Sequence, residues 1–478
     1  MVTDDRLGQL GSGTRAYAPD YPRPGWAEQS PALWEAALGP AIADALAEAG
    51  VQGSAVRGLG IAGQLDGCVA VDGAGRALGR CIIWMDRRAA RDAEVLPAAE
   101  LRALTGVVAD ATHMAAKIRW LKREDPAARR AVHFHQPVSY LVGRLTGARV
   151  FDHALASTTM LYALDRRDFA PALLAAFEVE RSELPAIAEA GDRAGMLSEQ
   201  GAALAGLPVG LPVAVGSGDD FATPLGAGLV APGAVACVLG TAEVVGALDP
   251  APRIDQQGLV ETHAYPGGGF YIENPGWLAG GALSWLSGLL GFDDVDALDA
   301  AAAELAPGAD GLTFIPALSG AMAPEWIASA RGVFYGLTPS HARGHLARAV
   351  LEGCTFAMRD VVERLASLGV ATDHLLLLGG GARSRLWAQM RADCSARPVR
   401  VPTRRDTSAV GAAICAAVAG GLYDEIADCA HLAGRSAETI DPDPGHRAAY
   451  DDAYHAYRRL FDSLRPMYGR GGAGRSRQ

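Results

Sequence analysis

The pattern of apolar and polar positions predicts helices and short strands that alternate along most of the chain. Helical patterns cover residues 31–49, 276–290, 341–368 and 407–421, and Ser30 with Pro31 supplies a favourable start for the first of them. Short apolar runs bounded by turn residues predict strands over 56–61, 68–71, 81–84, 212–216, 234–246 and 374–378. Residues 97–205 have mostly helical patterns, as expected of an insertion or cap.

Helices and strands mixed through two halves of similar size predict an α/β fold with a cleft between two domains. The chain has 478 residues, which is enough for two or three domains with sizeable cores. Residues 469–478 are rich in glycine and arginine, and we expect them to form a disordered tail.

Charge and targeting signals narrow the class of protein. The formal net charge is −11, which argues against non-specific nucleic-acid binding. No apolar leader or stretch of about 18 apolar residues is visible, so we expect a cytoplasmic protein without a membrane anchor. The seven cysteines are scattered without a C-x-x-C pair, as expected of buried thiols in a reducing compartment.

Several kinds of chemistry are disfavoured by particular residue types. Lys117 and Lys122 are the only lysines, and no G-x-x-x-x-G-K-[ST] loop is present. His133 and His135 have no Cys, Asp or Glu at a ligand spacing, so we expect no metal site formed by side chains alone. A dinucleotide oxidoreductase would need a G-x-G-x-x-G after an early strand, and none occurs.

Four segments at strand ends are candidates for a binding site. Three glycines after the run 374–378 would let backbone N–H groups approach a nucleotide, and the Gly240-Thr241 turn could hold a phosphate. Asp219 and Asp220 follow a strand and a glycine turn, where a carboxylate can act as a general base. Each has an ordinary structural alternative, respectively a packing turn, a hairpin and a helix cap. The fourth group, Gln64, Leu65 and Asp66 with Trp84, would suit a polyol, or could be ordinary loop residues.

Taken together and in order, these segments resemble the FGGY family of carbohydrate kinases, which includes xylulokinases and glycerol kinases. The matching segments are 22–29, Gly63-Gln64, Trp84-x-Asp86-x-Arg88, 117–120, 140–147, 156–158, Gly218-Asp219, 239–241, 330–332, 336–338, 348–353, 379–382 and 411–413. The resemblance implies two actin/hexokinase-like (ribonuclease H-like) domains, an N-terminal sugar-binding domain over 1–228 and a C-terminal nucleotide-binding domain over 229–468.

The resemblance also implies a role for each candidate residue. Asp219 matches the family's catalytic base, which takes the proton from the sugar hydroxyl that attacks the γ-phosphate of ATP. The resemblance implies Mg²⁺ bridging the phosphate oxygens, a small-molecule sugar or polyol as substrate, and a possible homodimer. The positions implied to bind substrate are Gln64, Leu65, Asp66, Trp84 and Asp220, and those implied to bind nucleotide are Gly240, Thr241, Gly280, Gly380, Gly381 and Arg385.

The sequence departs from the family pattern in two places. The family opens with a strand and an Asp-x-Gly-Thr phosphate loop, and we expect both to be missing here, either because the given start lies downstream of the true one or because the protein lacks this half of the phosphate site. Typical xylulokinases have Gln-Met-His-Gly at 64–67 and Gly-Asp-Asn at 218–220, where this chain carries Asp66 and Asp220. Two carboxylates suit a neutral polyol or ketose and repel a sugar acid, so a pentulose such as xylulose is favoured.

Two functions therefore stay open on the sequence. The first is an ATP-dependent, xylulokinase-like sugar kinase, and the second is a non-catalytic relative that senses sugar or nucleotide after losing its first phosphate loop. The retained Asp219 favours the enzyme, because a sensor has little use for a base beside the sugar hydroxyl.

Overall fold

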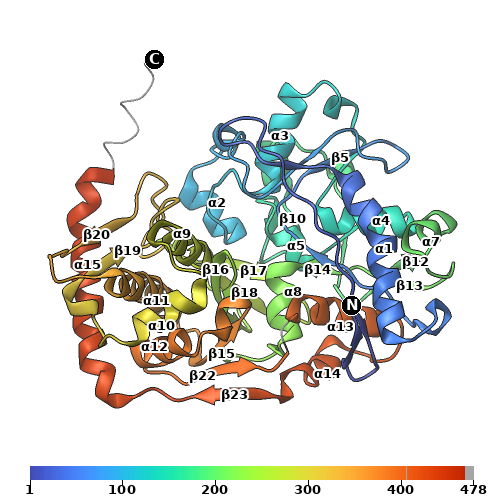
Figure 1. Ribbon diagram of the computed structural model, residues 1–478. Coiled ribbons are helices and arrows are strands. Elements are labelled where there is room, and N and C mark those ends of the chain that lie inside the picture. The colour runs from blue at the N-terminus through green and yellow to red at the C-terminus, as the bar shows by residue number, and fades with distance from the viewer. Residues whose placement is uncertain (405, 469–478) are drawn as a thin grey trace.

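The protein consists of two halves that lie side by side, each built from helices and strands (Figure 1). This computed structural model describes residues 1–404 and 406–468, so the tail predicted over 469–478 lies outside the described residues. Two helices are long, α11 (Arg343–Ser367) and α15 (Arg447–Tyr468). No helix in the described ranges is both long enough and apolar enough to cross a bilayer.

The first half contains many short elements. Its helices are α1 (Pro31–Ala49), α2 (Ala98–Thr105), α3 (Met114–Glu124), α4 (Pro137–Thr146), α5 (His153–Ser157), α6 (Pro171–Ala176), α7 (Glu199–Ala205) and α8 (Asp219–Gly226). Its strands are β1 (Val2–Thr3), β2 (Gln9–Gly11), β3 (Glu28–Gln29), β4 (Ala62–Gly63), β5 (Val69–Val71), β6 (Cys81–Ile82), β7 (His133–His135), β8 (Val150–Asp152), β9 (Tyr162–Ala163), β10 (Asp168–Phe169), β11 (Ala186–Ala188), β12 (Arg193–Met196), β13 (Pro212–Ala214) and β14 (Ser217–Gly218).

The second half is built on longer strands. These are β15 (Gly233–Leu239), β16 (Ala242–Asp249), β17 (Glu261–Ala264), β18 (Phe270–Leu278), β19 (Thr313–Ile315), β20 (Val333–Tyr335), β21 (Thr372–Leu378), β22 (Val399–Pro402) and β23 (Ala437–Ile440). Its remaining helices are α9 (Gly280–Leu290), α10 (Val295–Ala303), α12 (Arg385–Ser395), α13 (Thr407–Ala419) and α14 (Ile426–Ala430).

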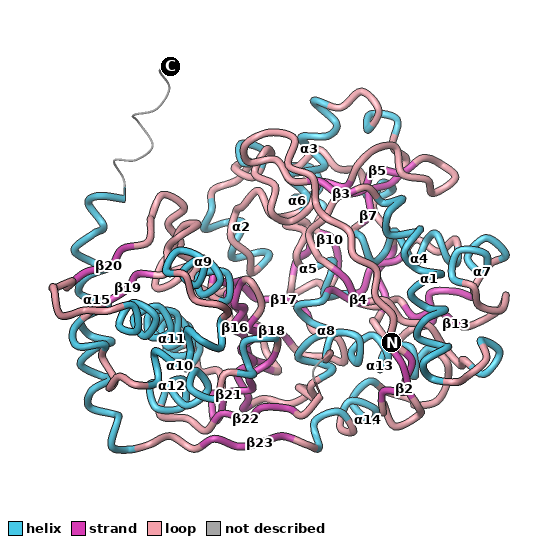
Figure 2. The backbone as a smooth tube through the Cα atoms, viewed as in Figure 1, coloured by secondary structure: helices cyan, strands magenta, loops and turns pink. Residues whose placement is uncertain are grey.

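Seven of these strands form one sheet, in the order β17-β18-β16-β15-β21-β22-β23, with helices against both faces (Figure 2). Side chains along β15 alternate between two cores, as the two-residue period of a strand requires. Val235 and Cys237 pack with residues of α11 and α12, whereas Ala234 and Ala236 pack with residues of α8 and α13. The sheet is therefore covered on both faces, which explains the apolar runs of its central strands β15 and β21.

Helix α8 of the first half packs tightly on helix α13 of the second. A Cβ atom at Gly226 would lie 1.8 Å from the Thr407 carbonyl oxygen, and one at Gly411 would lie 2.1 Å from the Ala222 carbonyl oxygen. Only glycine at these two positions permits so close a backbone contact. This contact joins the two halves and fixes α8, whose first turn carries Asp219 and Asp220.

The sequence pattern predicted the main elements better than their bounds. The helix over 31–49 is confirmed, and Gly50 ends it in the left-handed conformation. The strand expected over 56–61 is reduced to one bridge, between Leu59 and Val213, and regular pairing starts at Ala62. The helix expected from 276 begins at Gly280, since β18 continues through Leu278. Short strands interrupt the helical patterns expected over 97–205.

A fully buried ion pair ties the strand after Thr241 to helix α12. The guanidinium of Arg391 donates to the carboxylate of Glu243 at 2.8 Å, and both side chains are completely buried. Burial raises the pKa of Glu243, against the opposing effect of Arg391. Removing one partner of such a pair leaves a buried charge without compensation.

We predict that Arg391→Met lowers the melting temperature of the second half by roughly 10 °C, because an unpaired buried carboxylate costs about 3–5 kcal/mol. Replacing Glu243 by Met as well should restore much of this loss, because no charge then stays buried. Differential scanning calorimetry measures both effects. The matched control is Arg385→Met on the same helix. It breaks the exposed pair with Glu438 and should change the melting temperature little. Equal losses in the single and double variants would contradict the prediction.

Candidate active site

Two paired strands bring the predicted base and the predicted sugar-binding loop together. Strands β14 and β4 run parallel, with Ser217 opposite Ala62 and Gly218 opposite Gly63. The carboxyl ends of parallel strands meet at one edge, so Asp219 follows one strand while the loop over 64–66 follows its neighbour. A Cβ atom at Gly218 would lie 3.0 Å from Leu65 Cδ2, so the Leu65 side chain lies directly against the strand that precedes Asp219.

Asp66 is the buried member of this group, at 2% exposure. Its backbone has a φ of 60°, and its N–H donates to the Gln136 side-chain oxygen at 2.8 Å. Lys117 donates from Nζ to the Asp66 carbonyl oxygen at 2.5 Å. Burial lowers the pKa of Lys117. The contact with the Asp66 carbonyl oxygen holds the lysine side chain against the loop, so Lys117 stabilises the loop structurally. The Asp66 backbone therefore has the left-handed conformation, which few residues other than glycine adopt, and this conformation sets the position of the Asp66 carboxylate.

The other predicted substrate residues lie around this loop with differing exposure. Gln64 is partly buried and donates to the Gln29 side-chain oxygen at 2.6 Å. Trp84 is 45% exposed, on the turn that follows β6. That turn is fixed by Asp86, which is fully buried and accepts from the Ala27 N–H at 2.6 Å. Asp86 is therefore a structural residue that orients the turn, and the Trp84 indole is left available for contact.

Asp219 and Asp220 are a partly buried pair of carboxyl groups on the first turn of α8. Burial raises the pKa of Asp219. Burial, with the nearby carboxylates of Asp219 and Asp66, raises the pKa of Asp220 to about 8. A carboxylate with a raised pKa is a stronger proton acceptor than an ordinary one, which suits a general base.

Sequence analysis missed a buried group of acids and histidines beside these carboxyls, which we call the acid–histidine cluster. It comprises Asp66, His113, Glu261, His263 and Glu273, each of them 2–3% exposed. His113 Nδ1 lies 3.4 Å from Asp66 Oδ2, and His113 Nε2 lies 3.4 Å from Glu261 Oε1. His263 Nε2 lies 3.5 Å from Glu261 Oε2 and 3.6 Å from Glu273 Oε1. The cluster therefore connects the first half to strands β17 and β18 of the second.

Charge alternates through this cluster. Burial opposes the charged form of His113, but Asp66 and Glu261 outweigh it and raise the pKa of His113 well above its usual value. Burial likewise opposes ionisation of Glu261, yet His113 lowers the pKa of Glu261 to about 2. Burial and the surrounding carboxylates, with Asp220 first among them, raise the pKa of Glu273 well above its usual value. His113 thus lies between the side chains of Asp66 and Glu261, whose proximity favours its charged form, while the raised pKa of Glu273 favours its neutral form.

A strand pattern could have indicated part of this cluster. Glu261 and His263 are two residues apart, so a strand there would place both side chains on one face. Glu273 could not be found in this way, because its place depends on the antiparallel register that sets it opposite Glu261. His113 precedes helix α3 and carries no signal of its own.

The predicted nucleotide residues gather at one edge of the seven-stranded sheet. Strands β15 and β21 run parallel with Val238 opposite Leu378, so the turn at Gly240-Thr241 and the glycines after 378 emerge side by side. The Thr241 carbonyl oxygen accepts from the Gly281 N–H at 2.9 Å, at the start of α9. A Cβ atom at Gly280 would lie 2.4 Å from the Gly240 carbonyl oxygen. Gly380 and Gly381 lie in the adjacent 3-10 turn.

Arg385 stands apart from this glycine-lined edge, because its side chain pairs with Glu438 on β23 and is largely exposed. A cavity of about 460 Å³ opens nearby, between α10 and the turn before α12. Asp299 in its wall accepts from the Ser384 hydroxyl at 2.7 Å. Its lining residues, none of which is among the predicted site residues, are Asp296, Asp299, Ala300, Ala303, Arg383 and Ser384.

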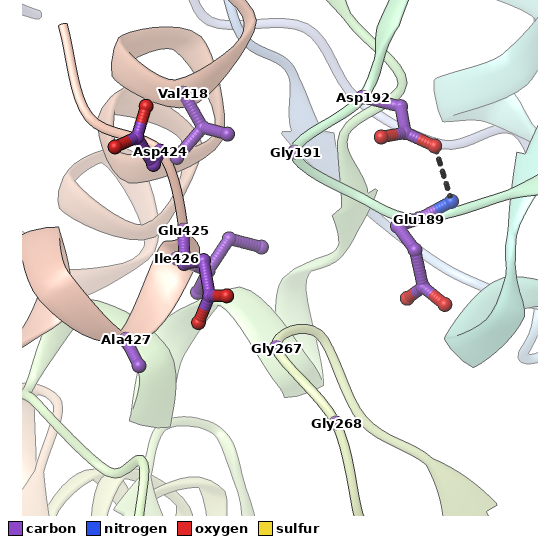
Figure 3. A pocket seen from close by; sticks show the side chains of 10 residues that line it. All are labelled: Glu189, Gly191, Asp192, Gly267, Gly268, Val418, Asp424, Glu425, Ile426 and Ala427. Atoms are coloured by element: carbon purple, nitrogen blue, oxygen red, sulfur yellow. Dashed lines mark hydrogen bonds between the residues drawn. The ribbon is translucent and has the colours of Figure 1, made fainter.

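A second hollow, of about 320 Å³, lies between Glu189–Asp192 and Asp424–Ala427 (Figure 3). Its acidic side chains line opposite walls, and Asp192 accepts from the Glu189 N–H at 3.1 Å. None of the predicted site residues lines it. It is therefore separate from both the paired carboxyls and the glycine-lined edge.

Comparison with known proteins finds matches over most of the chain. The family described as "FGGY family of carbohydrate kinases" matches with its N-terminal domain over residues 2–226 and its C-terminal domain over residues 235–420. The chain is 32% identical to a xylulose kinase of Escherichia coli (strain K12) over 93% of this chain and 92% of that protein. It is 33% identical to a glycerol kinase of Gloeobacter violaceus, over 89% of this chain and 86% of that one.

A solved structure extends the likeness to three dimensions. A protein from Brucella ovis described as a "xyloylose kinase" superposes with a TM-score of 0.87 at 32% identity, covering 94% of this chain and 93% of that one. The two-domain architecture expected from the sequence is thereby confirmed. The chain belongs to the FGGY family of carbohydrate kinases.

Proposed function

We propose that this protein transfers the γ-phosphoryl group of ATP to a hydroxyl of a neutral sugar or polyol, with a pentulose such as xylulose favoured. The observation that carries the proposal is the pairing of β4 with β14, which sets the partly exposed Asp219 beside the loop of the buried Asp66. Curated relatives are named as kinases of xylulose and of glycerol, which favours catalysis over the non-catalytic alternative and leaves the acceptor to be identified.

In the proposed reaction Asp219 accepts the proton of the attacking hydroxyl. The hydroxyl oxygen forms a bond to the γ-phosphorus as the bond to the β-phosphate oxygen breaks, and ADP leaves. Gln64, Leu65, Asp66, Trp84 and Asp220 would hold the acceptor. The turn at Gly240-Thr241 would contact the phosphates, because its amides and hydroxyl lie at the start of α9.

The glycine-lined edge fits a nucleotide on steric grounds. Gly280 and Gly379 both lie where a Cβ atom would meet a backbone oxygen, at 2.4 and 2.6 Å respectively, so the segments of this edge pack backbone to backbone, and a Cβ atom at Gly380 would face open space. We propose that Gly380 and Gly381 lie against the adenosine, with the cavity beside α10 open to its base. Arg385 would have to leave Glu438 to join them.

Mg²⁺ would be held mainly by phosphate oxygens and water. Among the described residues no group of three His, Cys, Asp or Glu side chains is arranged to bind a metal ion, and Mg²⁺ ordinarily keeps several waters. When bound with ATP, the ion neutralises charge that develops on the phosphates. Asp219 and Asp220 are the acidic side chains at the proposed point of transfer.

The matched family regions, 2–226 and 235–420, fall within the sugar-binding domain proposed over 1–228 and the nucleotide-binding domain proposed over 229–468. The cytoplasmic location, the homodimer and the missing first phosphate loop stay predictions.

We predict that Asp219→Asn lowers kcat by about 10²–10⁴-fold while the KM for the sugar changes little, because the amide keeps the shape of the site but accepts no proton. The measurement is sugar-dependent ADP release with Mg-ATP across pentuloses, hexuloses, pentitols, erythritol and glycerol. Asp192→Asn, in the separate hollow of Figure 3, is the matched control and should leave turnover unchanged. Turnover that survives Asp219→Asn, or wild-type silence across the panel, would count against the proposal.

We also predict that kcat/KM for the sugar falls as the pH is lowered through a midpoint above the ordinary carboxyl range. The base must be ionised to accept a proton, and burial raises the pKa of Asp219, so its active form is lost at a higher pH than for an exposed aspartate. Initial rates at saturating Mg-ATP between pH 4.5 and 9 measure this profile. A rate that stays constant down to pH 4.5 would contradict the role given to Asp219.

A further inference from the structure

Strands β17 and β18 present four polar side chains toward α8, the helix that begins at Asp219. Glu261 lies opposite Glu273, and His263 lies opposite Tyr271, so all four share one face of the ladder. Phe221 of α8 packs against this face, with its ring centre 5.6 Å from that of His263 and 6.2 Å from that of Tyr271. The polar face is thus held against the helix that begins at Asp219.

Several polar atoms of this face, and of the Asp66–His113 pair beside it, have no hydrogen-bond partner within the described chain. They are Asp66 Oδ1, His113 Nδ1, His263 Nδ1, the Tyr271 hydroxyl and Glu273 Oε2. Each belongs to a side chain that is at least nine-tenths buried. Buried polar atoms in folded proteins nearly always have a partner, so five such atoms in one group indicate a ligand that supplies hydrogen bonds.

The chemistry of the group defines that ligand. Asp66 Oδ1 accepts hydrogen bonds, Tyr271 and a protonated Glu273 can donate or accept them, and His113 is already held between Asp66 and Glu261. Hydroxyl groups donate and accept at the same atom, so they satisfy such a mixed set. An anionic ligand would be repelled by Asp66, Glu261 and the base.

The number of unpartnered atoms bears on ligand size. Glycerol has three hydroxyls, and when one of them faces Asp219 only two are left for Asp66, Glu273, His263 and Tyr271. A four- or five-carbon polyol or ketulose offers at least one more oxygen. The longer substrate therefore leaves fewer buried polar atoms without a partner, and each such atom weakens binding.

Building on the proposed kinase function, we propose that the acid–histidine cluster, with Tyr271, forms the end of the acceptor site remote from Asp219 and selects neutral polyols or ketuloses of four or more carbons over glycerol. His113 is a positioning residue in this site, because it contacts one oxygen of Asp66 and leaves the other for the substrate. Glu261 contacts His113 from the second half. The Oε1 atom of Glu261 also accepts from the N–H of Val108 in the first half, at 2.7 Å.

The test compares Glu273→Gln and His113→Gln with the wild type. Values of kcat and KM are measured for glycerol, erythritol, pentitols and pentuloses, and calorimetry measures binding of the same compounds without ATP. Glu425→Gln, an exposed acid in the hollow of Figure 3, is the matched control. Thermal melting establishes that each variant is folded.

We predict that the wild type prefers the longer acceptors, and that both variants raise KM for them at least 10-fold, mainly through weaker binding, while glycerol changes less than about 3-fold. Equal effects on glycerol and on longer acceptors, or no effect of either variant, would overturn the proposal. If the wild type turns over no neutral compound, the kinase function fails instead. Calorimetry then decides this inference separately, since long polyols should still bind and Glu273→Gln should weaken that binding.

Discussion

The close contact between α8 and α13 sets the geometry on which the rest of the site depends. Glycines at 226 and 411 let the two backbones meet where any Cβ atom would collide with a carbonyl oxygen. That contact belongs to the core shared by the two halves, with Phe221 and Ile414 buried in it. The start of α8 is therefore fixed relative to both the β4 loop and the seven-stranded sheet, and with it the two carboxyl groups of Asp219 and Asp220.

Electrostatics then explains how so many acids can share one buried region. Five carboxyl groups lie near one another here, and if all were ionised they would repel one another strongly in a medium of low polarity. They belong to Asp66, Asp219, Asp220, Glu261 and Glu273. The fold reduces this repulsion by placing His113 between Asp66 and Glu261, and by an environment that raises the pKa of Glu273 and so favours its neutral form. Asp66 Oδ1, Glu273 Oε2 and the Tyr271 hydroxyl have no hydrogen-bond partner within the described chain. Binding of a neutral polyol would supply hydroxyl groups as their partners.

Local sequence identified the parts of the site that lie at strand ends and not those that depend on pairing between distant segments. Asp219 and Gly379 each follow a strand that ends in a turn, and this transition can be recognised in the sequence. In the structure the β4 loop lies beside Asp219, and the Gly240-Thr241 turn lies beside Gly379. Glu273 and His113 have no such signal, because a register over β17 and β18 and a contact between the halves bring them together. The strand expected over 56–61 failed for the same kind of reason. Within it only Leu59 forms a bridge, with Val213 of β13, and regular pairing starts where β14 lies alongside, at Ala62.

The proposed acceptor site brings side chains from both halves onto one molecule. A crystal structure of the protein with a non-hydrolysable ATP analogue, Mg²⁺ and its best pentulose or pentitol would show this directly. We expect one hydroxyl within hydrogen-bond distance of Asp219, and other hydroxyls on Asp66 Oδ1 and Glu273 Oε2. An acceptor bound without contact to Asp219, or ordered water on Asp66 and Glu273 beside a bound sugar, would contradict the proposed site.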